Sequence, residues 1–466
     1  MKTLALFLAL LAPAFAEKPN VLLICVDDLR PELKSFGAEH IHSPAMGSLA
    51  ASGRAFTRHY VQAPTCGASR YTLLTGKYGK TGAQRNNDAL MASAKDADKQ
   101  PFSLPRQFRE NGYRTVAVGK VSHYPGGLGG KDWNDPAKTE MPGSWDVNLM
   151  PVGPWKTPQA AMHGYADGVP RGPGTPVSEH KEGDDMRYTD GWVTKEALTQ
   201  MDGLAEKKEP FFLAVGIMKP HLPFACPKFY LDLYEKAEFP PIPHPQKPAG
   251  LSTWHNSGEF NRYARGARDP WKEPAFADDI RRSYAACVSF ADTQVGQLLA
   301  HLEKQGLAEN TIVVLWGDHG WHLGEHAVWG KHTLFEESLR APLVIRAPGM
   351  KHAGKATEAI VETIDIYPTL CELAGVPVPK DLSGGSLLPH LEDPQTVGGE
   401  AVSYFGSNET IRTDRHRLIR HNNGKKEPAY ELYDHSSPEK EAKNIAAAHP
   451  DLVRDLSAKL DAKLGK

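Results

Sequence analysis

Four short apolar runs, each followed at once by titratable residues, constrain the fold of this chain more than any other feature of its sequence. The runs cover residues 21–26, 115–118, 211–217 and 311–316, and segments with helical periodicity, such as 283–304, lie between them. Continuous apolar runs of this length are typical of strands buried on both faces of a parallel sheet. Strands that alternate with helices predict an α/β fold in which helices flank a large, mostly parallel sheet.

Each of these runs leads to residues that can carry chemistry. Asp27 and Asp28 follow the first run, Lys120 and His123 the second, His221 the third, and Asp318 and His319 the fourth. Because ligands bind beyond the carboxyl ends of the strands in such sheets, we expect these side chains to meet at one edge. The carboxylates are hard oxygen ligands suited to Ca²⁺. An Asp-Asp pair after a strand can also form a turn or cap a helix.

The chain has 466 residues, which predicts one large domain and a smaller one. Segments 124–187 and 240–274 are rich in Gly, Pro and charge and lack clean periodicity. Such segments predict surface insertions that form the rim of a pocket. Strand patterns at 401–405, 410–412 and 416–420 and a helix pattern at 452–464 predict an antiparallel C-terminal subdomain. We place the catalytic domain at residues 17–395 and the subdomain at 396–466.

The N-terminus has the pattern of a secretory signal peptide, with Lys2, a short apolar stretch and then Ala14-Phe15-Ala16. We expect residues 1–16 to be removed by cleavage after Ala16, and the protein to be periplasmic or secreted. A buried helix or an anchor is the alternative, but the run is too short to span a bilayer, and we expect no membrane insertion. The formal net charge of −2 gives no sign of a nucleic-acid partner.

The 5 cysteines are an odd and sparse set, which does not predict a disulfide framework. Cys25 lies in the first apolar run and is expected to be a core residue. Cys66 opens the segment C-G-A-S-R-Y-T-L-L-T-G-K, in which residues 69–74 have a helical pattern. A cysteine just before a helix N-terminus and beside Arg70 is in a setting that favours a thiolate or another anion. A partly buried free cysteine is the alternative.

The segment that begins at Cys66 resembles the signature of the sulfatases, in which Cys-x-Pro-x-Arg or Cys-x-Ala-x-Arg precedes Leu-Thr-Gly. This chain has Ala68 where most members have Pro. The resemblance implies an alkaline-phosphatase-like fold and the oxidation of Cys66 to formylglycine by a formylglycine-generating enzyme. The hydrated aldehyde has two hydroxyls on one carbon, so one can attack sulfur and the other can collapse to the aldehyde and expel sulfate.

The resemblance also implies a metal site. Asp27 and Asp28, with Asp318 and His319 in Asp-His-Gly, would bind Ca²⁺ together with the formylglycine oxygen of residue 66. Most sulfatases have Asn or Gln where this chain has His319. Histidine at this position is similar to the iduronate-2-sulfatase branch of the family, although it is a less usual calcium ligand.

Further roles follow from the same resemblance. Lys120 and His123 match a Lys-x-x-His motif, in which the lysine would neutralise sulfate oxygens and the histidine would bond the formylglycine hydroxyl. Arg70 would hold the formylglycine through charge-assisted hydrogen bonds. Asp318 would accept the proton of the nucleophile in addition to binding the metal.

The substrate side of the site would come from three more residues. His221 and Lys331 would contact sulfate oxygens, and His221 is the better candidate for protonating the departing alcohol. Trp321 would line the sugar pocket. The resemblance implies hydrolysis of a sulfated polysaccharide or oligosaccharide at the 2-O-sulfate of a uronic acid. The alternatives are a phosphodiester or phosphonate hydrolase of the same superfamily and a glycan-binding protein that has lost catalysis.

Overall fold

The computed structural model describes residues 18–94, 102–127, 129, 134–135, 137–251, 255–422, 424 and 427–466. The predicted signal peptide at residues 1–16 lies outside the described residues. In the part of the chain that is described, no helix combines the length and the apolar character that a bilayer span requires.

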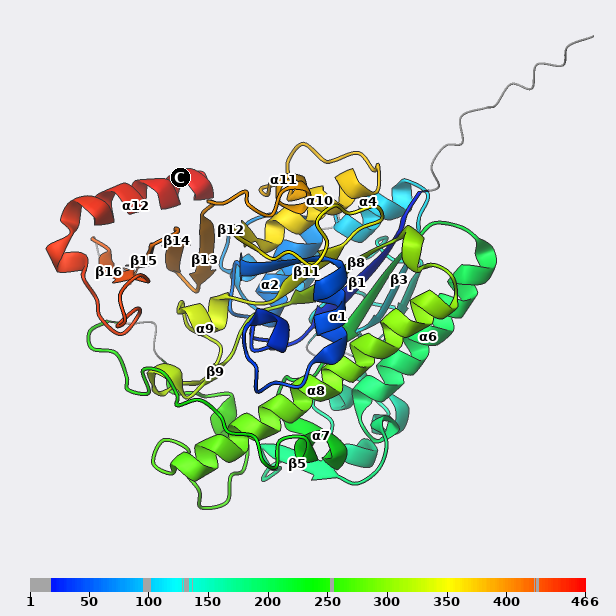
Figure 1. Cartoon of the computed structure of the whole chain (residues 1–466), viewed down its shortest axis with the longest axis horizontal. Coiled ribbons are helices and arrows are strands. Elements are labelled where there is room, and N and C mark those ends of the chain that lie inside the picture. Colours follow the sequence, from blue (N-terminus) through cyan, green and yellow to red (C-terminus); the bar gives the residue numbers. More distant parts are fainter. Residues whose placement is uncertain are drawn as a thin grey trace, which may run out of the picture.

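An eight-stranded sheet forms the centre of the molecule, in the order β12-β2-β11-β8-β1-β6-β3-β4 (Figure 1). Its strands are β1 (Asn20–Val26), β2 (Arg54–Tyr60), β3 (Arg114–Gly119), β4 (Val147–Leu149), β6 (Phe211–Ile217), β8 (Thr311–Gly317), β11 (Leu343–Arg346) and β12 (Thr357–Glu362). Strand β1 is parallel to both of its neighbours, β6 and β8. Strand β11 runs antiparallel to β8 and β2. The predicted mostly parallel sheet is therefore confirmed.

The four predicted apolar runs are four adjacent strands, β8, β1, β6 and β3, in the middle of this sheet. Successive side chains of β1 enter opposite layers of the core. Leu22, Ile24 and Val26 join one hydrophobic cluster, and Val21, Leu23 and Cys25 join the other. Both faces are buried, which is why these runs are apolar without alternation.

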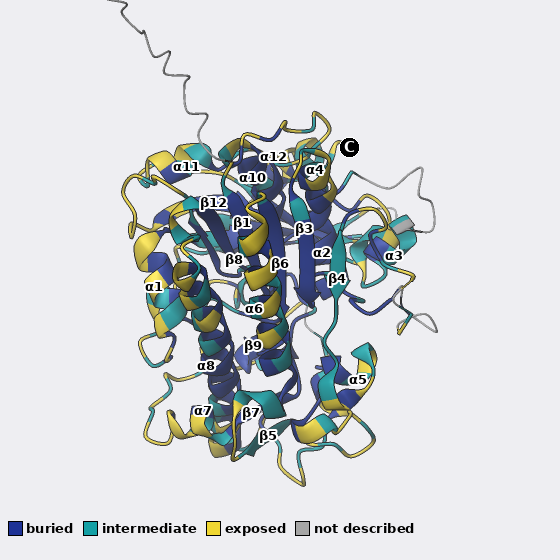
Figure 2. Cartoon of the chain, turned by 90° about the vertical axis from the view of Figure 1, so that its right-hand side faces the viewer, coloured by how far each residue is buried: buried dark blue, intermediate teal, exposed yellow. Residues whose placement is uncertain are grey.

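Helices cover both faces of the sheet. Helices α1 (Pro44–Ser52), α6 (Thr189–Lys207) and α8 (Pro274–Lys304) supply buried residues to one layer, and Figure 2 shows α6 and α8 in front of the strands. Helices α2 (Cys66–Thr75), α4 (Leu104–Glu110) and α10 (Ile366–Leu373) supply the other. The helix predicted at 283–304 is the C-terminal part of α8.

The C-terminal subdomain is a four-stranded antiparallel sheet covered by one helix. It contains β13 (Ala401–Phe405), β14 (Asn408–Arg412), β15 (His416–His421), β16 (Ala429–Asp434) and α12 (Pro450–Leu464). Three of these strands and the helix were predicted, and β16 was missed. Leu456 and Leu460 of α12 pack with Leu418 and Leu432 of the sheet, beside Ala68 of α2. The subdomain thus contacts the helix that begins at Cys66, while the domain boundary at residue 396 stays a prediction.

The shorter elements lie in the connections. They are α3 (Ala89–Ala94), α5 (Pro158–Met162), α7 (Lys228–Asp232), α9 (Glu336–Leu339) and α11 (Leu388–Glu392), with the strand pairs β5 (Ser178–Lys181) and β7 (Phe224–Pro227), and β9 (His322–Leu323) and β10 (Trp329–Gly330). The predicted insertion at 240–274 contains a 3₁₀ turn, Phe260–Arg262, in its described part, as expected for a segment without periodicity.

Candidate active site

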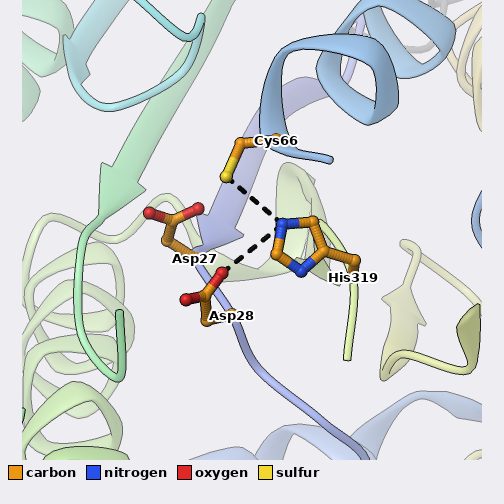
Figure 3. Close-up of side chains that lie close together, drawn as sticks. All are labelled: Asp27, Asp28, Cys66 and His319. Atoms are coloured by element: carbon orange, nitrogen blue, oxygen red, sulfur yellow. Dashed lines mark hydrogen bonds and ion pairs between the residues drawn. The ribbon is translucent and has the colours of Figure 1, made fainter. Parts of the chain in front are cut away.

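The carboxyl ends of β1 and β8 meet the N-terminus of α2 at one point. Asp27 and Asp28 follow β1, His319 comes just after β8, and Cys66 is the first residue of α2. Figure 3 shows the four side chains pointing toward one another. All four are buried, and one ligand atom from each lies within 4.8 Å of the others. Three of the strand-end residues that the sequence singled out, Asp27, Asp28 and His319, are therefore brought together with Cys66.

Arg70 connects the strands that surround this point. Its Nε and Nη2 donate to Asp318 Oδ2 at 3.1 and 2.9 Å, and Nη2 also donates to Asp27 Oδ1 at 3.1 Å. Nη1 donates to the carbonyl of Val121, just beyond β3, at 3.1 Å. Across the described residues, these hydrogen bonds reach carboxylates and carbonyls and not the Cys66 sulfur. Arg70 thus holds the two carboxylates together, and its hydrogen bonds to a formylglycine at residue 66 stay a prediction.

Two lysines complete the charge pairing. Lys120 Nζ donates to Asp27, and although burial opposes ionisation, Lys120 holds the pKa of Asp27 well below its usual range. Lys331 Nζ donates to Asp28 Oδ1 at 2.8 Å and lies 3.4 Å from Cys66 Sγ. Burial of the Lys331 side chain lowers its pKa, but the Asp28 carboxylate has the opposite effect, and the pKa of Lys331 is raised well above its usual range. Both lysines are therefore cations that face the position of residue 66.

The donor set fits a divalent cation. Asp28 Oδ2 is buried and has no hydrogen-bond partner, a costly state that a metal ion would relieve. Asp28 also has a left-handed backbone (φ 57°), which is uncommon outside glycine and occurs at functional sites. The Tyr284 hydroxyl holds this turn by donating to the Asp28 carbonyl at 2.8 Å.

His319 has the protonation state that a metal ligand needs. Its Nδ1 lies 3.1 Å from the Gly320 carbonyl, which can only accept, so Nδ1 carries the proton. The lone pair on Nε2 then faces Asp28 Oδ1 at 3.4 Å and Cys66 Sγ at 3.2 Å. Burial, and next the Lys331 charge, lower the pKa of His319 to about 4, which keeps the ring neutral.

Cys66 is 2% exposed, and its environment does not favour a thiolate. Burial, and then the Asp27 carboxylate, raise the pKa of the Cys66 thiol well above its usual range. Burial and the Asp27 charge therefore oppose the predicted thiolate, and the Arg70 charge does not favour it because Asp27 and Asp318 already neutralise that charge.

The two predicted histidines lie beyond strand ends. His123 follows β3, and its ring packs edge-on against Tyr124 with centroids 4.5 Å apart. Burial and the Lys120 charge hold the pKa of His123 well below its usual range, so the ring is neutral. His221 follows β6 in a turn held by Asp190 of α6, whose carboxylate accepts the backbone N–H groups of the two residues after β6 at 2.8 Å each.

Trp321 is completely buried. Lys331 Nζ lies 5.4 Å from its ring centroid, and Phe224 packs edge-on against it at 6.2 Å. The Trp321 ring therefore packs against Lys331 and Phe224 and is not exposed to solvent. The predicted role of Trp321 in lining a sugar pocket stays a prediction.

Sequence reasoning missed Glu259 and His163, which come from the two insertions. Glu259 lies 3.4 Å from both Lys331 Nζ and His221 Nε2. The His163 ring lies 5.3 Å from that of His221. Neither segment has a periodic pattern that could have marked these positions, so only the general expectation that the insertions form a pocket rim was possible.

The sheet order, the site at its carboxyl edge and the small C-terminal sheet define an alkaline-phosphatase-like fold. The phosphonate monoester hydrolase of Agrobacterium radiobacter has a similar fold, with a TM-score of 0.76 and 23% identity, over 96% of this chain and 95% of that chain.

Residues 19–376 match the sulfatase family, and residues 324–466 match the C-terminal region of N-sulphoglucosamine sulphohydrolase. A sulfatase of Formosa agariphila is 31% identical over 92% of this chain and 83% of its own length. The iduronate 2-sulfatase of Mus musculus is 33% identical over 77% of this chain and 69% of its own length. The chain belongs to the sulfatase family and is a hydrolase of sulfuric esters.

Proposed function

We propose that this sulfatase removes the 2-O-sulfate of a uronic acid from a sulfated glycan, using a formylglycine made from Cys66 and a bound Ca²⁺. The observation that carries the proposal is the place of residue 66, between the His319 imidazole and the Lys331 ammonium beside three carboxylates. The similarity to iduronate 2-sulfatase and the histidine at 319 support a uronic acid as the sugar.

Each group in the site has a part in this reaction. Asp27, Asp28, Asp318, His319 and residue 66 would hold the ion, which supplies positive charge for the sulfate and the nucleophile. A formylglycine hydrate supplies one hydroxyl for attack on sulfur and a second whose collapse releases sulfate. Lys120 and Lys331 face the same position and neutralise sulfate oxygens.

Proton transfer falls to the two histidines and to Asp318. His123, neutral and next to Lys120, is suited to accept a hydrogen bond from the hydroxyl at residue 66. Asp318 also faces this site and can accept the proton of the nucleophile. His221 donates a proton to the oxygen of the departing alcohol.

Conversion of Cys66 to formylglycine requires a formylglycine-generating enzyme as a partner. In the folded protein Cys66 is 2% exposed, and every residue of α2 is buried. The modifying enzyme therefore acts on the chain before it folds. This order fits a protein that is modified during export and then works in the periplasm or outside the cell.

Two measurements on the purified protein test the proposal. Mass spectrometry of the peptide that contains residue 66 should show formylglycine in place of cysteine. Sulfate release should be faster from 2-O-sulfated uronides than from matched sugars sulfated at other positions, and aryl sulfate should be cleaved in preference to aryl phosphate. An unaltered thiol in fully active enzyme would refute the formylglycine mechanism, and a preference for another sulfate position would refute the substrate.

A further inference from the structure

A second group of possible metal ligands lies outside the active site. His322 begins β9, His326 lies in the turn that follows β9, and Glu337 belongs to α9. One ligand atom from each of the three lies within 4.8 Å of the others. Figure 1 shows β9 and α9 between the large sheet and the C-terminal subdomain. This group shares no residue with the proposed calcium site.

The His326 ring is buried with its polar atoms unused. The residue is 2% exposed, and among the described residues neither ring nitrogen has a hydrogen-bond partner. Phe335 stacks on the ring, with centroids 4.4 Å apart and planes at 28°. The backbone N–H of His326 donates to the His244 carbonyl at 2.7 Å. Because unpaired polar atoms are costly in a protein interior, the ring is held in a place that suits a ligand on its nitrogens.

Glu337 faces this ring. Its Oε2 lies 3.7 Å from His326 Nδ1, which is too long for a hydrogen bond. Within the described part of the chain, this buried oxygen also has no hydrogen-bond partner. Two ligand atoms that each lie about 2.0–2.1 Å from a tetrahedral Zn²⁺ are about 3.4 Å from each other. The nitrogen and the oxygen are therefore separated by nearly the distance that one ion between them requires.

His322 can supply a third ligand at little cost. Its ring nitrogens lie 3.2 Å from the Glu325 carbonyl and 2.9 Å from Thr333 Oγ1. Each of these partners has a second hydrogen bond, since the Glu325 carbonyl accepts the Val328 N–H at 3.0 Å and Thr333 Oγ1 lies 2.9 Å from Ser338 Oγ. A turn of the His322 ring toward an ion would therefore leave neither partner unpaired.

The neighbouring carboxylates are already paired with arginines. Glu325 pairs with Arg30 at 3.0 Å, and Glu441 pairs with Arg417 at 2.5 Å. The ion pair of Glu337 in the described chain is with His326, so this carboxylate is the one that has no arginine partner. A cavity of about 590 Å³ is lined by both His326 and Glu337, and it gives an ion and a water molecule access to them.

We propose that His322, His326 and Glu337 bind one Zn²⁺, with a water molecule from the cavity as the fourth ligand. Two imidazoles and a carboxylate suit Zn²⁺, whereas Ca²⁺ prefers a larger set of oxygens. The ion would join the β9–β10 segment, which leads to Lys331, to α9. Glu336 of α9 pairs in turn with Arg417 of β15 at 2.6 Å. Zinc at this place would stabilise the packing between the segment that carries Lys331 and the C-terminal subdomain.

The test is a calorimetric titration of Zn²⁺ into untagged, full-length Cys66→Ala that is saturated with Ca²⁺. The Cys66 substitution and the calcium keep zinc from binding at the active site. We expect the protein to bind one equivalent of Zn²⁺. Glu337→Gln and His326→Gln, each added to this protein, should weaken binding at least ~10-fold, a loss that even residues which only support metal ligands can cause.

The neighbouring group of Glu336, His435 and Glu441 supplies the matched control. Its carboxylates are paired with Arg417, so His435→Gln should leave the affinity for zinc unchanged. Anomalous diffraction from zinc-soaked crystals of the Cys66→Ala protein should place the ion about 2.0–2.2 Å from His326 Nδ1 and Glu337 Oε2. This measurement decides the question if circular dichroism shows that the Glu337 and His326 variants are unfolded.

Three results would overturn the proposal. They are no binding of zinc to the calcium-saturated protein, an affinity that both variants leave unchanged, and an anomalous peak at Glu336 and Glu441 in place of His326 and Glu337. None of these results depends on the ester that the enzyme hydrolyses, so the zinc site and the proposed function can fail separately.

Discussion

Replacing Arg70 by methionine removes the cation that joins Asp27 and Asp318 at the ends of β1 and β8. Arg70 is fully buried, and three of its hydrogen bonds go to these two carboxylates. Methionine keeps much of the side-chain volume but leaves both carboxylates with less compensation. Breaking a buried ion pair by removing one partner costs about 3–5 kcal/mol.

The size of the effect should depend on calcium. Unfolding entropies of about 2.1 cal/mol/K per residue imply that 1 kcal/mol corresponds to about 1 °C for a chain of this length. We expect the Tm of Arg70→Met to fall by about 3–5 °C in the presence of a chelator. Ca²⁺ brings positive charge to the same carboxylates, so the fall in Tm of Arg70→Met should be about half as large with saturating calcium as with the chelator. By linkage, a difference of about 2 kcal/mol means that the variant binds Ca²⁺ roughly 30-fold more tightly than the wild type.

The assay is thermal unfolding followed by circular dichroism, with chelator and with calcium, and Arg54→Met is the matched control. Arg54 is also fully buried, but its guanidinium donates to backbone carbonyls, among them those of His352, His390 and Leu391 at 3.0, 3.1 and 2.9 Å. Its replacement should be destabilising by an amount that calcium does not change.

Equal losses for Arg70→Met in the two conditions would refute the reasoning, since they would mean that Arg70 does not share its carboxylates with the ion. A larger loss with calcium would refute it as well, because it would mean that Arg70 assists the binding of the ion. Weaker Ca²⁺ binding by the variant in a calorimetric titration would lead to the same conclusion.

Three more predictions follow from the site. Cys66→Ser should fold with a stability within about 1 kcal/mol of the wild type, because serine and cysteine are close to isosteric. The variant should stop after one turnover with a sulfonate group on residue 66, which mass spectrometry can detect. Sustained turnover would contradict the proposed release step. Chelation should abolish sulfate release and added Ca²⁺ should restore it, and an enzyme that is insensitive to chelator would contradict the assignment of the carboxylates to a metal. Gly330→Ala would place a Cβ 2.9 Å from His255 Cε1 at a φ of +154°, so it should cost about 1–3 kcal/mol and displace the loop that carries Glu259. Gly266→Ala, with φ +63° and nothing within 4 Å, is the control for backbone strain alone, and equal effects of the two substitutions on activity would refute the steric explanation.

The central strands could be predicted because each is buried on both faces. Strand β2 has the sequence R-A-F-T-R-H-Y, which contains no continuous apolar run. Its Arg54 is nevertheless fully buried, because carbonyls from distant loops accept its donors. The carbonyls that accept hydrogen bonds from Arg54 belong to residues about 300 positions later in the chain, so the sequence around β2 carries no pattern that reveals them. This strand could therefore not be predicted.

The same reasoning separates the site residues that were predicted from those that were not. Asp27 and Asp318 follow apolar strands, and strand ends in a parallel sheet meet at one edge. Glu259 reaches the site from an aperiodic segment, held by Trp329 more than 60 positions later in the chain. Trp321 was expected to line a sugar pocket, but a sequence does not show that Lys331 and Phe224 pack against its ring or that the ring is buried.

The charges of the site indicate why sulfate and not phosphate is the fitting ester. Three carboxylates are paired with three cations, in the contacts of Asp27, Asp28 and Asp318 with Arg70, Lys120 and Lys331. A bound Ca²⁺ would then leave this set of residues with a charge of +2, which a sulfate monoester with one negative charge and an ionised hydroxyl of the proposed formylglycine would balance. A phosphate monoester carries a second negative charge near neutral pH, and in this buried site the extra charge would have no partner.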